Sequence, residues 1–187
     1  MKIWQRFTRQ TRKEYPVKAR LAAMACGGLV FVFAMPAAIL WLAATGDDGW
    51  RFRLPLAVAV VALVLAAHGL SLALWTVWVQ FRHARGTPIP LMATQKLLTD
   101  KPYALCRNPM ALGLLVYFLG IATASSSLRA VLAVMIFSVL LIAYIKLVEE
   151  KEMASRFGDE YARYKQSTPF ILPRLASLWR KPGAHGP

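Results

Sequence analysis

Three charged side chains could do chemistry, because each lies at the border of a long apolar stretch. The first, Arg107, is followed by Asn108 and Pro109 and then by an apolar run. A guanidinium at the start of a helix can bind a carboxylate or a phosphate through two hydrogen bonds, and the free amides of the first helical turn favour the same anion. An interfacial arginine that only reaches the lipid headgroups is the alternative, and the residue types alone leave both open.

The other two charged side chains are Glu149 and Glu150, which follow directly after a second apolar stretch. Carboxylates are unfavourable at a helix C-terminus, so two in succession indicate a positively charged partner. Lys146 and Lys151 are the nearest candidates in the sequence. The cation or the hydroxyl groups of a ligand would be the functional partners.

Other polar side chains give weaker signals. Tyr161 and Tyr164 are spaced to share one face of a helix, where they could contact a ligand or anchor the chain at an interface. His68 lies within an apolar block, which makes it a functional candidate, although a neutral histidine bonded to a neighbouring helix is the more frequent case. Cys26 and Cys106 have no spacing typical of a metal site or a disulfide framework. Cys106 is either a reactive thiol or, more often at such a place, a small packing residue.

The composition indicates which class of protein positions these residues. Of the 187 residues, 57% are hydrophobic and only 17% are charged, and the apolar residues fall in long blocks. This pattern is typical of a membrane protein, and the length suits one compact helical bundle. The net charge of +14 does not indicate a nucleic-acid-binding protein, because the Lys and Arg residues flank the apolar blocks.

The apolar blocks predict an all-α integral membrane protein with about four transmembrane helices. We expect spans at 21–45, 54–81 and 128–148, each long enough to cross a hydrocarbon core of roughly 30 Å, and a shorter one at 110–124. Pro36 predicts a kink in the first span. A polar helix should follow the last span and end near Tyr164.

The positively charged segments predict the orientation. Residues 1–20, the loop 82–107 and the tail 175–187 are rich in Lys and Arg, so both termini are expected in the cytoplasm. The short hairpin formed by the last two spans then returns the chain to the side that it left. The segment around Arg107 and the pair Glu149-Glu150 should therefore meet on the cytoplasmic face. We divide the chain into a basic segment 1–20, two N-terminal helices 21–81, a core 82–174 and a basic tail 175–187.

The motifs of the core, taken together, resemble the isoprenylcysteine carboxyl methyltransferase and phospholipid methyltransferase family. The resemblance covers residues 86–174, with the motifs in the family's order and spacing, and the first two spans match only in type. The motifs are Gly86-Thr-Pro-Ile-Pro90, Leu97-Leu-Thr-Asp-Lys-Pro-Tyr103, Arg107-Asn-Pro-Met110 with Gly113, Glu149-Glu150, Phe157-Gly158, Tyr161, Tyr164, and Pro169 through Pro173-Arg174.

The resemblance implies a membrane enzyme that binds S-adenosylmethionine in a pocket completed by the cytoplasmic C-terminal helical segment, and that releases S-adenosylhomocysteine. The acceptor would be lipid-like or isoprenoid, would come from the bilayer, and would be methylated on a carboxylate or on a phospholipid amine without a metal. The resemblance assigns catalysis to Arg107, Asn108 and Glu150. It assigns cofactor binding to Tyr103, Arg107, Asn108, Pro109, Leu112, Gly113, Glu149, Glu150, Tyr161 and Tyr164.

Two departures from the family pattern leave alternatives open. Ala111 stands where the family often has tyrosine, and Lys101 replaces a common glycine. The first change fits an enlarged acceptor pocket, an unusual acceptor or an inactive member. A non-catalytic membrane scaffold or lipid-binding protein is therefore the main alternative, and a sterol-reductase-like enzyme that uses NADPH is a weaker one. The Ala- and Arg-rich composition suggests a bacterial inner membrane, in which a phospholipid amine, an isoprenoid acid and a small thiol are all conceivable acceptors.

Overall fold

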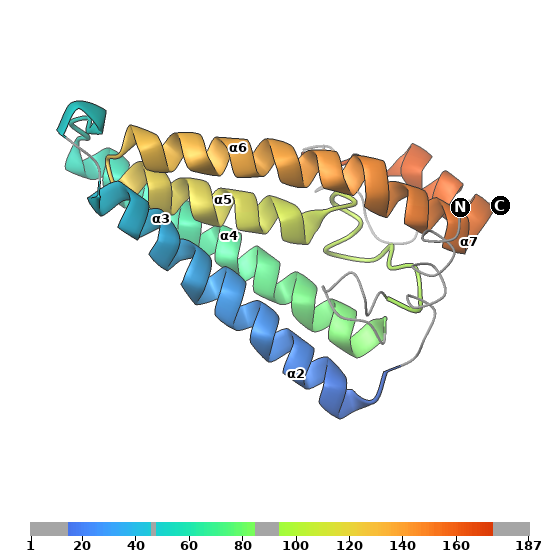
Figure 1. The fold of residues 1–187 in the computed structure, drawn as a ribbon. Helices are drawn as coiled ribbons and strands as arrows, with labels where there is room; N and C mark the ends of the chain where they lie inside the picture. Colours follow the sequence, from blue (N-terminus) through green and yellow to red (C-terminus); the bar gives the residue numbers. More distant parts are fainter. Residues whose placement is uncertain (1–14, 46–47, 85–93, 174–187) are drawn as a thin grey trace.

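The computed structural model describes residues 15–45, 48–84 and 94–173. These residues form a bundle of helices, and the expected all-α membrane fold is confirmed (Figure 1). The described residues do not include the basic residues 1–14, the motif at 86–90, Arg174 or the tail 175–187. The elements are α2 (Val17–Gly28), the π-helical turn η1 (Leu29–Ala34), α3 (Met35–Ala44), the short η2 (Asp48–Trp50), α4 (Leu56–His83), α5 (Pro109–Ala124), α6 (Leu128–Tyr144), the π-helical turn η4 (Ile145–Glu149) and α7 (Glu150–Ser167).

Three helical runs are long and apolar enough to cross a membrane, and α5 is a shorter apolar helix beside them. The first run is continuous from Val17 to Ala44, and the last from Leu128 to Ser167. The expected polar helix is therefore a direct continuation of the last span. The apolar part of that run ends at Val148, so Glu149 and Glu150 lie beyond the membrane-spanning part.

Pro36 changes the hydrogen bonding of the first helix rather than ending it. Proline has no amide hydrogen, so the carbonyl of Val32, one turn earlier, lacks its usual helical donor. The hydroxyl of Tyr117 on α5 donates to this carbonyl at 3.0 Å, and the π-helical turn η1 directly precedes Met35. The irregular helix is thus hydrogen-bonded to α5, as expected where no water can satisfy a free carbonyl.

Helices α4 and α5 are packed with their backbones in contact. A Cβ placed on Gly69 of α4 would lie 2.6 Å from the carbonyl oxygen of Gly113 on α5, and one placed on Gly120 would lie 2.5 Å from that of Ala62. Because lipid tails are as apolar as leucine, membrane helices associate through close packing of such small residues. The same face of α4 buries Ala62, Ala66, Gly69, Ala73 and Thr76.

The hairpin of α5 and α6 brings the polar ends together, as the sequence predicts. Figure 1 shows the start of α5, the end of α4 and the whole of α7 at one end of the bundle, while the turn between α5 and α6 lies at the other. At the α7 end, α2 diverges from α6 (Figure 1). Arg20, which is buried on α2, donates to the carbonyl of Phe81 at 2.6 Å and so ties α2 to the last turn of α4.

His68 does not bond to a neighbouring helix, so that expectation was wrong. Its side chain is exposed on α4, and its Nδ1 lies 2.8 Å from the carbonyl oxygen of Val64 in the same helix. The i−4 carbonyl is within reach of a side chain that has no polar partner on the lipid-facing surface.

Replacement of Gly113 with alanine tests the contact between α4 and α5. The added methyl group would meet the carbonyl of Gly69 and the amide of Ala73, so the helices must move apart. We expect the free energy of unfolding to fall by about 1–3 kcal/mol. Gly28→Ala is the matched control, because a Cβ there has nothing within 4 Å and alanine favours a helix. Thermal unfolding in detergent measures the stability of both variants. A melting temperature of Gly113→Ala equal to that of the wild type would contradict the backbone contact.

Candidate active site

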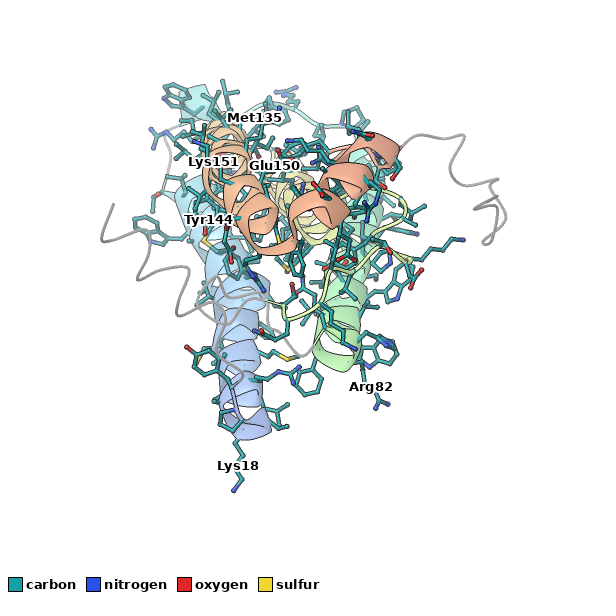
Figure 2. The ribbon with its side chains drawn as sticks, turned by 90° about the vertical axis from the view of Figure 1, so that its right-hand side faces the viewer. Lys18, Arg82, Met135, Tyr144, Glu150 and Lys151 are labelled. Carbon is teal, nitrogen blue, oxygen red and sulfur yellow. The ribbon has the colours of Figure 1, made fainter. Side chains whose placement is uncertain are left out.

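The site is centred on an ion pair between two residues that are far apart in the chain. Arg107 lies in the irregular segment directly before α5, and Glu150 is the first residue of α7. The Nη1 of Arg107 donates to Oε1 of Glu150 at 2.5 Å, and the two side chains are only 9% and 12% exposed. Figure 2 looks onto this end of the bundle and shows Glu150 in the upper part of that face, with Lys18 and Arg82 pointing away at its lower side.

The second oxygen of Glu150 binds another cation. The Nζ of Lys165 lies 2.7 Å from Oε2, and this side chain is 50% exposed. The partners expected from the sequence, Lys146 and Lys151, are therefore not the ones that Glu150 binds. Lys146 instead places its ammonium 4.9 Å from the ring centroid of Phe170. The carboxylate is thus held by one buried cation and one half-exposed cation.

A single glycine makes the contact with Lys165 possible. Gly158 interrupts α7 with φ 51 and ψ −125, a conformation that other residues adopt only under strain. The helix changes direction there, and Figure 2 shows its two halves at an angle. The second half turns the side chains of Tyr161, Tyr164 and Lys165 back toward the first residues of α7.

The two tyrosines of α7 have different partners. The hydroxyl of Tyr161 accepts a hydrogen bond from Nη1 of Arg107 at 3.4 Å, so it belongs to the charged cluster. The hydroxyl of Tyr164 donates to the backbone carbonyl of Tyr103 at 2.8 Å, and Nε2 of Gln80 donates to the Tyr103 hydroxyl at 2.5 Å. Burial raises the pKa of Tyr161, Tyr164 and Tyr103, so all three phenols stay neutral at physiological pH.

The segment 168–173, which follows α7, is fixed to the start of α5. The backbone amide of Arg107 donates to the carbonyl of Pro169 at 2.9 Å, and Nδ2 of Asn108 donates to that of Phe170 at the same distance. The guanidinium carbon of Arg107 lies 5.6 Å from the ring centroid of Phe170, within the range of a cation–π interaction. Asn108 therefore holds the C-terminal segment against the site.

A second buried ion pair fixes the loop that precedes Tyr103. Nη1 of Arg156 lies 2.9 Å from Oε1 of Glu152 one turn earlier in α7, and the two side chains are 5% and 7% exposed. Arg156 also donates to the backbone carbonyl of Thr94. This contact holds residues 94–98 on α7. Leu97 and Leu98 pack there against a buried cluster formed by Val79, Tyr103, Tyr161 and Tyr164.

The carboxyl group of Glu149 has a shifted pKa, and the guanidinium of Arg107 has a nitrogen without a hydrogen-bond partner in the described part of the chain. Burial, and secondarily the carboxylate of Glu152, raise the pKa of Glu149 from 4.5 to about 7. Glu149 can therefore accept or release a proton near neutral pH. The Nε of Arg107 is buried and has no hydrogen-bond partner in the described part of the chain, which leaves one donor for a ligand acceptor.

The structure does not bring all of the expected cofactor residues to the ion pair. Pro109 is buried at the first turn of α5, and Leu112 is half-buried on that helix. Gly113 faces the backbone of α4 at Gly69 and Ala73, where it allows the close packing of the two helices. The roles of these three residues in cofactor binding stay predictions.

Two members of the cluster were not predicted from the sequence. Lys165 follows Tyr164 directly, but no pattern indicated that α7 turns at Gly158. Phe170 lies within the motif from Pro169 to Pro173, yet its position between two cations depends on the fold. Cys106 is buried, and burial raises the pKa of its thiol, so it has the character of a packing residue.

No three side chains of His, Cys, Asp or Glu gather as metal ligands within residues 15–45, 48–84 and 94–173. The groups that do gather are a carboxylate with two cations, a second carboxylate that titrates near neutrality, and several aromatic rings. Such a set can bind a zwitterionic ligand and can accept a proton.

Comparison with known proteins gives two matches. A sequence model of the family described as phospholipid methyltransferase matches residues 57–160, which run from the start of α4 into the second half of α7. The chain is also 34% identical over 84 residues to the cobalt-zinc-cadmium resistance protein CzcN of Cupriavidus metallidurans. That alignment covers 45% of this chain and 38% of the relative, so the chain matches well under half of the relative's length.

The raised pKa of Glu149 predicts how stability depends on pH. An unfolded glutamate loses its proton near 4.5, whereas the folded protein keeps it until about 7, so stability should fall as pH rises through this range. Glu149→Gln removes this dependence. We expect the variant to match the wild type at pH 4.5 and to melt a few degrees higher at pH 8. Thermal unfolding across this range measures the effect; parallel curves for both proteins would show that Glu149 ionises normally.

Proposed function

Because the chain belongs to the phospholipid methyltransferase family, we propose that it transfers a methyl group from S-adenosylmethionine to a lipid-like acceptor at the membrane surface. Its helices identify it as an integral membrane protein, and the family is one of methyltransferases. The charge bias of the loops supports a site and both termini on the cytoplasmic side, and we propose a bacterial inner membrane as the location.

The single observation that carries the proposal is the cluster of Arg107, Glu150 and Lys165 at the point where α5 and α7 begin. It fits S-adenosylmethionine, which has an ammonium and a carboxylate at one end and adenosine at the other. Oε2 of Glu150 already accepts an ammonium, and the buried Nε of Arg107 is a donor without a partner in the described residues. Tyr161, whose hydroxyl is hydrogen-bonded to Arg107, is buried next to this pair, and the ring centroid of Tyr164 lies 6.3 Å from that of Tyr161. We expect these two rings to line the adenosine end of the site.

The residues of the chain would act by positioning. S-adenosylmethionine, when bound, supplies a methyl group on a sulfonium, and transfer of that methyl is a displacement that needs correct alignment above all. Glu150 would hold the cationic or hydroxyl groups of the cofactor, while Arg107 orients Glu150 and offers Nε to an acceptor oxygen. The segment 168–173, fixed by Asn108, would exclude water from the reacting atoms.

The environment of Glu149 favours an amine over a carboxylate as the acceptor group. A carboxylate is already nucleophilic at neutral pH, whereas a protonated amine must lose a proton before it can attack. Glu149, with its pKa raised to about 7, is suited to accept that proton near the ion pair. A phospholipid amine is therefore our first choice, and carboxylate methylation of an isoprenoid acid the second.

Titration calorimetry tests whether the cofactor binds. We expect detergent-purified protein to bind S-adenosylhomocysteine with micromolar affinity, and Glu150→Gln to weaken binding at least about tenfold, because the neutral amide cannot pair with a cation. Lys151→Gln is the matched control, since Lys151 is exposed on the same turn of α7.

The outcomes separate the alternatives. A folded wild type that binds neither S-adenosylhomocysteine nor NADPH would indicate a scaffold or lipid-binding protein. Binding of NADPH alone would indicate a reductase. Either result would contradict the proposed function.

A further inference from the structure

The two cations that bind Glu150 differ in how easily they can leave. Arg107 is 9% exposed, and its backbone amide is hydrogen-bonded to Pro169. Lys165 is 50% exposed and reaches Oε2 with the end of a flexible stem. Arg107 is thus a fixed partner of Glu150, and Lys165 is an exchangeable one.

An exchangeable ammonium at this place stabilises the carboxylate of Glu150 when no ligand is bound. The Glu150 side chain is 12% exposed, and a poorly hydrated carboxylate oxygen without a partner is strongly unfavourable. The contact of 2.7 Å also shows that Oε2 accommodates a primary ammonium. A ligand that presents its own primary ammonium could take the same place, and Lys165 could then move into water.

We propose that Lys165 is a stand-in for the primary ammonium of the methyl donor, occupying Oε2 of Glu150 until the donor displaces it. The inference rests on the proposed function and adds to it the end of the donor that Glu150 recognises. Lys165 thereby sets specificity, because only a ligand whose cation competes for Oε2 gains access to the carboxylate.

Calorimetry with Lys165→Met tests the proposal without measuring catalysis. Removal of the competitor should tighten the binding of S-adenosylhomocysteine about two- to fivefold, the range expected for one partly exposed ion pair. Binding of 5′-methylthioadenosine, which has the nucleoside but no ammonium, should not change. Lys165→Arg keeps a competing cation and should bind S-adenosylhomocysteine as the wild type does.

Lys151→Met is the charge-matched control, because it removes the same charge from an exposed position of α7. Equal or weaker binding of S-adenosylhomocysteine by Lys165→Met would overturn the proposal, and so would equal tightening of both ligands. If the wild type binds neither ligand, the proposed function itself fails, and this outcome is distinct because it appears before any variant is compared.

Discussion

The backbone contact between α4 and α5 is the constraint on which the site depends. The backbones of the two helices touch at Gly69, Gly113 and Gly120. A Cβ at any of these positions would lie 2.5–2.6 Å from a carbonyl oxygen of the other helix, so no larger residue fits there. This contact fixes α5 relative to α4, and with it the depth at which Arg107, Asn108 and Pro109 lie. Because α6 is linked to α5 by a short turn and continues through η4 into α7, the position of Glu150 at the start of α7 follows from the same contact.

Local breaks in the last helix then bring the reactive groups together. The π-helical turn Ile145–Glu149 marks the transition from apolar to polar sequence, and Gly158 turns the second half of α7 back toward the first. π-helical turns are often found at functional sites because they change the direction of the side chains that follow. Together with the segment 168–173, these breaks surround Glu150 with a fixed cation and an exchangeable one.

Much of this arrangement could be predicted from the sequence, because it depends on long apolar blocks and on their connections. The return of the hairpin follows from the block lengths, and it predicts that Arg107 and Glu150 lie at one end of the bundle. Lys165 could not be predicted as a partner of Glu150, because its contact depends on the backbone conformation of Gly158. Gly113 packs against the backbone of α4, which a single sequence does not reveal, and its role in cofactor binding stays a prediction.

The most direct test of the central claim is methyl transfer in a membrane. Purified protein in nanodiscs of bacterial lipid would be supplied with S-adenosylmethionine that carries a labelled methyl group, and the label in the lipid extract would be counted. We predict label in the lipid fraction with the wild type and a loss of at least about a hundredfold with Arg107→Ala, which removes the fixed partner of Glu150. Equal label from both proteins, or none from a wild type that binds the cofactor, would contradict the account.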